Sequence, residues 1–219
     1  QASLEEALIG LSTLISEEEF ENLSNMVIDL QIGYADGIYS TEEALAKVAE
    51  IYALDMMPEI VDGVYQLSTK MHMVAFSAIA NKLDNKANAV MLNDIDMSEV
   101  DFQPIGNDVA GHRYSGTFDG QGHKFMNLSV NWGGNYFGLF GCVGAGAVIK
   151  NFIIDNSCYI FGTGSYGGII GGSNEAGTIT IQQLGMEGTI ETANVEAAGI
   201  IGCNMGSTAT FHIENCYVT

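Results

Sequence analysis

Basic residues are scarce in this 219-residue chain. It has 7 lysines and arginines against 27 aspartates and glutamates, and a formal net charge of −20. Proteins hold nucleic-acid phosphates with clustered lysine and arginine, and the same residues attract anionic membrane surfaces. We therefore expect neither nucleic acid nor an anionic membrane as a partner.

A long apolar run is also missing. Residues 131–149 carry no charge over about the length of a membrane span, but glycines and asparagines interrupt them throughout. We therefore expect no membrane insertion. No signal peptide is visible, and the chain begins at Gln1, which is expected of a processed or trimmed form.

Residues with catalytic or metal-binding spacing are sparse. Asp119 and His123 could form an acid–base pair, but FDGQGH is more typical of a glycine turn in which Asp119 bonds to backbone. Asp94 and Asp96 are candidates for a calcium site, but we expect that they do not share a calcium ion. The segment GAGAVI lacks the lysine and the helix of a phosphate loop. We predict no catalytic residue, no metal site and no cofactor.

The first sixty residues have a helical pattern. Apolar residues recur at helical spacing, and three serine–glutamate capping boxes precede them, beginning at Ser3, Ser16 and Ser40. Up to Asp62 there are 14 acidic residues, and Lys47 is the one basic residue. This predicts an acidic domain over residues 1–60, built as a small α-helical bundle.

The pattern changes near residue 60. Asp62-Gly63 separates two apolar runs, which is typical of a β-hairpin. Residues 69–81 then return to helical spacing. We expect residues 61–81 to cap the domain that follows.

Glycine recurs with a period of about 30 residues. The motif GLFG at 138–141 returns as GIIG at 168–171 and at 199–202. A period this short indicates a solenoid, in which each unit completes its core by stacking on the next. Glycine at the corners lets one coil lie directly on another. We predict a right-handed parallel β-helix over residues 61–219.

A second short motif, an amide residue followed in most repeats by a large apolar residue, recurs with about the same period as the glycines. Parallel stacking would place one set of amides in a ladder that bonds from coil to coil, and one set of apolar residues in a ladder inside. The expected amide ladder is Asn127, Asn151, Gln183 and Asn215, and the expected inner ladder is Leu128, Phe152, Leu184 and Cys216.

Four cysteines lie in this region: Cys142, Cys158, Cys203 and Cys216. Cys142 and Cys203 follow equivalent GxxG motifs two coils apart, about 9.6 Å at about 4.8 Å a coil. A disulfide needs Cα atoms within about 7 Å. We expect buried free thiols instead.

The GxxG coils resemble the GLUG repeat of bacterial secreted and surface proteins. The lead-in segments at 88–106 and 114–130, and the helix before them, are similar to the entry into such β-helices. The resemblance spans roughly residues 63–219. It implies export, with a secreted or cell-surface (outer membrane-associated) location in a bacterium, and implies no reaction.

Aromatic residues precede two of the GxxG corners. Successive coils would bring them side by side, and exposed aromatic rings stack well on sugars. The expected glycan-binding face is Trp132, Tyr136, Tyr159, Phe161 and Tyr166. The alternative is that several of these residues simply pack the corner.

Three functions remain open at this point. The first is a non-catalytic adhesion or binding module for an extracellular glycan or protein. The second is a β-helical polysaccharide lyase or glycoside hydrolase, which the shortage of cations disfavours. The third is a passive spacer in a larger surface protein. The strand expected at 213–218 has no cap, so we also expect either further coils or end-to-end self-association through residues 213–219.

Overall fold

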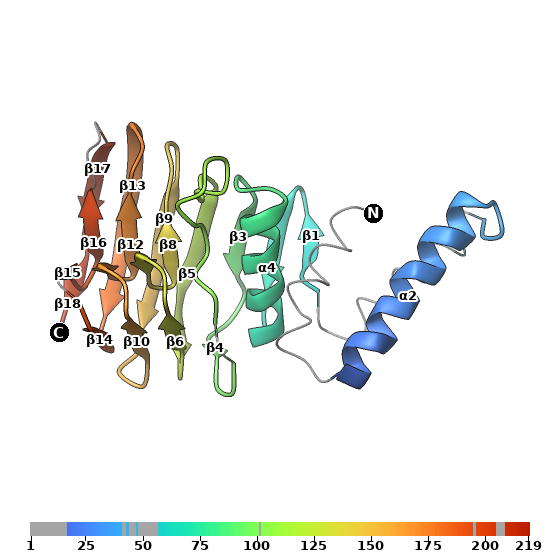
Figure 1. Cartoon of the computed structure of the whole chain (residues 1–219), viewed down its shortest axis with the longest axis horizontal. Helices are drawn as coiled ribbons and strands as arrows, with labels where there is room; N and C mark the ends of the chain where they lie inside the picture. The colour runs from blue at the N-terminus through green and yellow to red at the C-terminus, as the bar shows by residue number, and fades with distance from the viewer. Residues whose placement is uncertain are drawn as a thin grey trace.

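The computed structural model describes residues 17–40, 43, 47, 57–100, 102–194, 196–204 and 209–219. Its strands form a parallel β-solenoid of about four turns, with a helix and a hairpin at one end (Figure 1). The elements are α2 (Glu17–Ala35), β1 (Glu59–Val61), β2 (Val64–Leu67), α4 (Lys70–Lys82), β3 (Asn88–Met91), β4 (Ile95–Asp96), β5 (Thr117–Met126), β6 (Ser129–Trp132), β7 (Tyr136–Phe137), β8 (Phe140–Cys142), β9 (Val148–Ile154), β10 (Tyr159–Gly162), β11 (Tyr166–Gly167), β12 (Ile170–Ser173), β13 (Gly177–Met186), β14 (Thr189–Thr192), β15 (Glu196–Ala197), β16 (Ile201–Asn204), β17 (Ala209–Glu214) and β18 (Tyr217–Val218).

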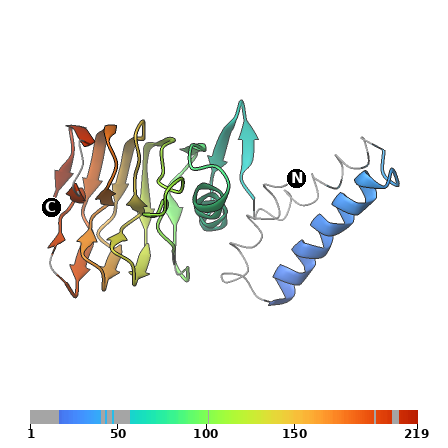
Figure 2. The ribbon, with the colours of Figure 1, turned by 45° about the horizontal axis from the view of Figure 1, so that its top comes forward.

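Four sheets run along the axis of the solenoid. The long sheet has the strand order β1-β2-β3-β5-β9-β13-β17, and three short sheets follow the orders β14-β10-β6, β15-β11-β7 and β16-β12-β8. The coils that begin with β5, β9 and β13 each contribute one strand to each sheet. Figure 2 shows these coils stacked side by side along the solenoid. The predicted parallel solenoid is confirmed.

The N-terminal end of the solenoid is closed by a hairpin and a helix. Asp62 and Gly63 both have positive φ, 50° and 78°, and join β1 to β2 in the expected antiparallel pair. Thr69 caps α4 by accepting a hydrogen bond from the backbone N–H of His72. The predicted hairpin and helix are therefore confirmed.

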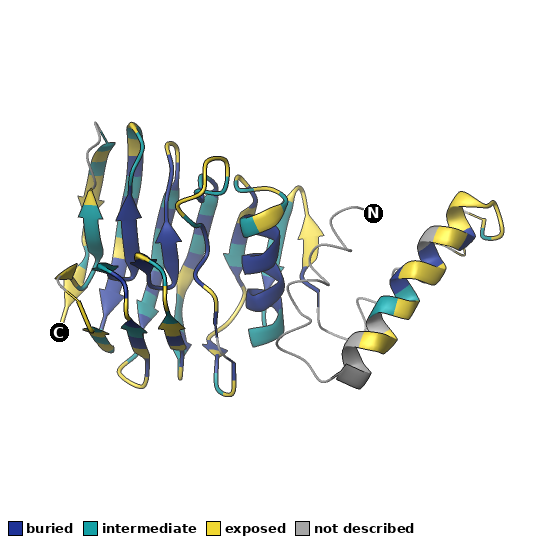
Figure 3. Cartoon of the chain, in the orientation of Figure 1, coloured by how far each residue is buried: buried dark blue, intermediate teal, exposed yellow. Residues whose placement is uncertain are grey.

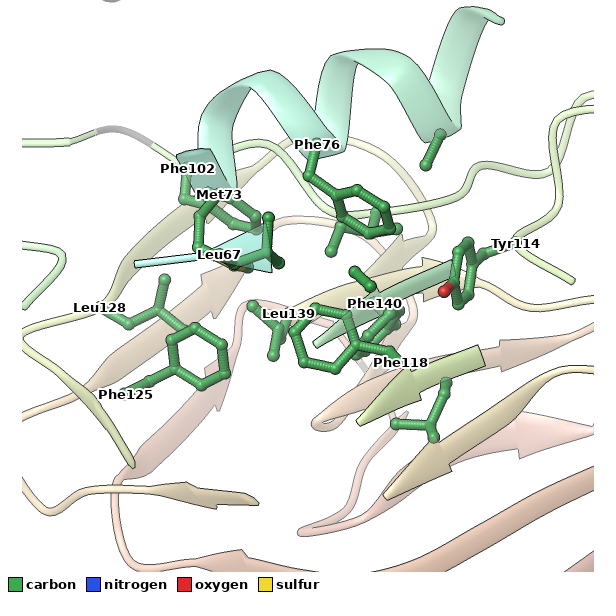
Figure 4. Close-up of a cluster of buried hydrophobic side chains, with 14 of the residues drawn as sticks. Leu67, Met73, Phe76, Phe102, Tyr114, Phe118, Phe125, Leu128, Leu139 and Phe140 are labelled. Atoms are coloured by element: carbon green, nitrogen blue, oxygen red, sulfur yellow. The ribbon is translucent and has the colours of Figure 1, made fainter. Parts of the chain in front are cut away.

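Aromatic rings fill the space beneath α4. Phe76 projects from the helix toward Tyr114 and Phe118 at ring-centroid distances of 6.1 and 6.0 Å (Figure 4). Phe118 in turn meets Phe140 at 5.3 Å and Phe152 at 5.7 Å. These rings are fully buried, so the helix and the first coils share one core.

The glycines of the GxxG motifs allow backbones to touch. A Cβ at Gly138 would collide with the carbonyl oxygen of Gly168 in the next coil. A Cβ at Gly171 would lie 2.7 Å from the backbone nitrogen of Phe137 and 2.8 Å from the oxygen of Gly141. The motif therefore serves the close stacking that its period predicted.

The predicted amide ladder is correct in part: Asn151, Gln183 and Asn215 lie in register, whereas Asn127 does not join them. Asn127 and Asn151 both have left-handed backbone, but they stand at different corners of the coil. β5 shifts register against β9 between Asp119 and His123, so Asn151 lies beside Gln121 rather than Asn127. Asn127 instead donates to the side chain of Asp96.

The inner ladder is correct in part. Phe152 pairs with Leu184 in the next coil, and both are buried. On its other side Phe152 pairs with His123, not with Leu128. Leu128 is buried at the following corner, where its backbone N–H points to the sulfur of Cys158.

One of the predicted N-terminal helices is described, as α2. Gly37, with φ 68°, follows its end. The Ser40–Glu43 capping box is present, because each residue's backbone N–H donates to the other's side chain. The rest of the expected bundle lies outside the described residues, and a bundle is not supported. Among the described helices none is both long and apolar enough to cross a membrane.

Burial declines in the last coil. Ile149 and Ile181 are fully buried in one column of the long sheet, whereas Ile213, next in that column, is 50% exposed (Figure 3). Val218 is 55% exposed. The outer edge of β17 is therefore an open strand edge with apolar side chains beside it.

Candidate functional site

Two of the predicted aromatic residues stand together on the outer face of β10. The rings of Tyr159 and Phe161 are nearly parallel, 5° apart, with centroids separated by 6.4 Å. Tyr159 is 42% exposed, and its hydroxyl donates to Glu191 across 2.6 Å. This hydrogen bond raises the pKa of Tyr159, because it stabilises the protonated hydroxyl. The pair forms an exposed aromatic surface.

Polar side chains flank the pair on the neighbouring coils. Phe161 lies in register between Asn131 of β6 and Glu191 of β14. A ligand resting on the rings would therefore meet an amide on one side and a carboxylate on the other.

The other three predicted residues do not join this face. Tyr136 is only 8% exposed, and its ring packs against Tyr166 of the next coil at 5.2 Å. Burial raises the pKa of Tyr136. Trp132 packs against the core, with its indole over Gly134. The prediction of a single five-residue face is wrong, because Trp132 and Tyr136 turn inward at the corner.

A larger open site lies where the long sheet bends, and we call it the amide groove. Its volume is about 640 Å³, and its lining is Asp119, Gln121, Gly122, Asn151, Phe152, Ile153, Gln183, Asn215 and Tyr217. The groove follows the solenoid axis across four coils.

One left-handed residue with a carboxamide side chain marks the bend in each of these coils. The φ angles are 52° at Gln121, 61° at Asn151, 55° at Gln183 and 54° at Asn215. Their spacings of 30, 32 and 32 residues were visible in the sequence. The sequence pattern matches Asn127 to Asn151 instead, because both precede a large apolar residue.

Asp119 is the charged group of the groove. Its carboxylate accepts from the side chain of Asn151 at 2.9 Å and from the backbone of Gln121 at 2.9 Å, and it pairs with Lys150 at 3.1 Å. Partial burial on its own raises the pKa of Asp119, but these donors outweigh it, so the net pKa lies below the usual range. The carboxylate is ionised at neutral pH and fully engaged.

Tyr217 forms one wall of the groove. Its ring lies over Gly185 of the preceding coil, where a Cβ would sit 2.6 Å from the ring. Its hydroxyl donates to Glu187 across 2.6 Å. Since Tyr217 is 41% exposed, the ring is held in place and still open to solvent.

The candidate catalytic and calcium pairs are separated. Asp119 bonds to the backbone of Gln121, as expected for a turn, and His123 pairs with Asp94 at 3.2 Å. Asp96 bonds to Ser98 and Asn127 instead. Within the described part of the chain, no group of three or more histidine, cysteine or acidic residues is arranged to hold a metal.

The cysteines are free thiols, as predicted. Cys142 and Cys203 face the same residue, Gly172, from opposite sides, one coil away in each direction. Burial raises the pKa of Cys142 to about 11 and that of Cys203 to about 12. Neither thiol is ionised at neutral pH, so neither is suited to nucleophilic attack.

These features define the class of the protein as a parallel β-solenoid with an open polar groove on its flank. No family model matches the chain, so membership of the GLUG-repeat proteins stays an expectation. The chain is similar to halomucin from Haloquadratum walsbyi, with 37% identity over 102 residues. That similarity covers 46% of this chain and only 1% of the length of halomucin.

Among solved structures, the chain is similar to a proposed immunoglobulin A1 protease from Bacteroides ovatus. The TM-score is 0.35 and the identity 14%, covering 72% of this chain and 76% of that one.

Proposed function

We propose that the chain is a non-catalytic binding module of a secreted or surface-displayed bacterial protein, and that it holds extracellular glycans on the outer side of its solenoid. The observation that carries this proposal is the parallel pair Tyr159 and Phe161. Aromatic rings pack against the apolar face of a sugar, and the flanking Asn131 and Glu191 offer hydrogen bonds to hydroxyl groups. The resemblance of the GxxG coils to GLUG-repeat proteins supports the location.

The charge pattern supports binding over catalysis. An enzyme acting on uronate polymers needs cations beside the substrate carboxylates, whereas this chain has a net charge of −20. Its one arginine, Arg113, is paired with Glu175 at 3.2 Å. Asp119 is held by three donors and has a lowered pKa, which suits neither a general acid nor a free base.

The test is a screen of the purified chain against immobilised neutral and acidic glycans. We expect binding to neutral glycans, at least tenfold weaker in a Tyr159→Ala/Phe161→Ala variant. The matched control is Tyr34→Ala, which removes an aromatic ring of similar exposure from α2. Unchanged binding in the double variant would refute the role of the pair. New reducing ends in the bound glycan would indicate a glycosidase or lyase, and no binding at all would indicate a spacer.

We also propose that the end of the solenoid at β17 is covered, either by further coils of a longer protein or by a second copy of the chain. Ile213 and Val218 expose about half of their surface there, beside the unpaired edge of β17. A hollow of about 200 Å³ lined by Met186, Gly188, Ile190, Ala197, Ala198, Gly199 and Val218 lies at the same end. Open parallel edges with apolar neighbours favour pairing.

A further inference from the structure

Backbone geometry alone does not explain why asparagine and glutamine occupy the four bends of the amide groove. Left-handed backbone disfavours most side chains by about 1–2 kcal/mol, and glycine avoids that cost. Asparagine is enriched in this conformation, but glutamine has no such advantage. Gln121 and Gln183 nevertheless stand at two of the four bends. All four residues have a carboxamide side chain. We therefore attribute the residue type found at each bend to its side chain rather than to its backbone conformation.

Three of the four carboxamides take no part in holding the coils together. The fourth, Asn151, donates to Asp119 of the neighbouring coil. Within the described residues, the side-chain amides of Gln121, Gln183 and Asn215 make no hydrogen bond, and all three residues are exposed. Each offers a donor and an acceptor to an external group. Four such groups stand in a line, about 14 Å from first to last at about 4.8 Å a coil.

The carboxylates beside this line are already engaged. Asp119 pairs with Lys150, Glu187 accepts from Tyr217, and Glu214 accepts from Gln182 at 3.0 Å. The groove therefore presents amides and an aromatic ring to a ligand. The rest of the chain carries excess negative charge, which repels an anionic polymer.

We infer that the amide groove binds a linear, uncharged polysaccharide lengthwise along the solenoid axis. The carboxamides hydrogen-bond to hydroxyl groups of successive sugars, and Tyr217, held over Gly185 by its bond to Glu187, stacks on one sugar ring. The inference deepens the proposed glycan binding and rests on it, but it uses residues other than Tyr159 and Phe161.

Isothermal titration with uncharged hexose oligomers, from disaccharide to hexasaccharide, tests the inference. Affinity should rise with length until the oligomer fills the groove. A Gln121→Gly/Gln183→Gly variant keeps the left-handed backbone without strain and removes two amides. We expect its Kd to rise about tenfold, with no fall in melting temperature. Tyr217→Ala should weaken binding by a similar factor, and a hexauronate of equal length should bind at least tenfold less tightly than the neutral hexamer.

The variants separate this inference from the proposed function. If the glycine variant binds as tightly as the parent while Tyr159→Ala/Phe161→Ala loses binding, the groove inference fails and the proposed function stands. If the groove variants lose binding and the aromatic pair does not matter, the inference stands and the pair is not the site. If no neutral oligomer binds the parent chain, both fail.

Discussion

The carboxylate of Asp119 accepts a hydrogen bond from the side-chain amide of Asn151 across 2.9 Å, from one coil of the solenoid to the next. The same carboxylate is bonded to the backbone of Gln121 and pairs with Lys150. It therefore links the bend of β5 to that of β9. The pH dependence of this link can be measured.

Asp119→Ala should lower the free energy of unfolding by about 1–3 kcal/mol at neutral pH, because it leaves Asn151 and Lys150 without their acceptor. The pKa of Asp119 is depressed in the folded protein, so its contribution is present above the unfolded value of about 3.9. It is lost as pH falls through the lower folded value. Urea melts of parent and variant should therefore converge in acid. A difference that persists unchanged at low pH would contradict the assignment. The control is Asp36→Ala, an exposed residue directly after the end of α2.

Phe152→Ala should cost about 3–5 kcal/mol, as truncation of a buried aromatic ring does. Phe152 is 1% exposed and meets Phe118 and Phe125 at 5.7 and 5.6 Å. Phe161→Ala, on the outer face, is the matched control and should cost far less. A loss below about 1 kcal/mol for Phe152→Ala in a reversible melt would mean that the core is packed differently.

Gly138→Ala should destabilise the fold by about 1–3 kcal/mol or more, because the added methyl group meets the backbone of the next coil and neither can yield. Gly133 offers a control, since its nearest neighbour would be the hydroxyl of Thr163 at 4.0 Å. Gly133→Ala should change stability by no more than about 0.5 kcal/mol. Equal thermal shifts in the two variants would argue against close stacking at the GxxG corner.

Light scattering over a range of concentrations should detect association through residues 213–219. High salt should strengthen it, because screening reduces repulsion between two chains of charge −20. An Ile213→Lys/Val218→Lys variant should remain monomeric throughout. A parent chain that is monomeric at every concentration and salt level would rule the contact out.

The repeat could be predicted from the sequence because each GxxG motif meets the same requirement: at one corner of the coil, the backbones of adjacent coils are in contact and leave no room for a side chain. The register of Asn151, Gln183 and Asn215 could also be predicted, but that of Asn127 could not. Asn127 and Asn151 share left-handed backbone and a buried following residue, and only the shift in β5 between Asp119 and His123 shows that they belong to different corners.

Two of the five residues predicted for the aromatic face stand together on it. Tyr159 and Phe161 are two apart on one strand, and the strand alternation places both rings on the same side. The same alternation places Trp132 of β6 on the side of buried Val130. Tyr136 lies in the two-residue strand β7, in which both residues are buried, and so short a strand has no alternation to read from the sequence.

Ile149 and Ile181 are buried, whereas Ile213, the next residue in the same column, is half exposed. This difference predicts the order in which the backbone amides of successive coils lose their protection from hydrogen exchange. Each coil is stabilised chiefly by its neighbours, so a coil with one neighbour opens at a lower free energy than a coil with two. Amide hydrogens of β17 should exchange with solvent first and those of β9 last. The solenoid would then open one coil at a time from the β17 side, leaving the aromatic core beneath α4 as the most slowly exchanging part of the chain.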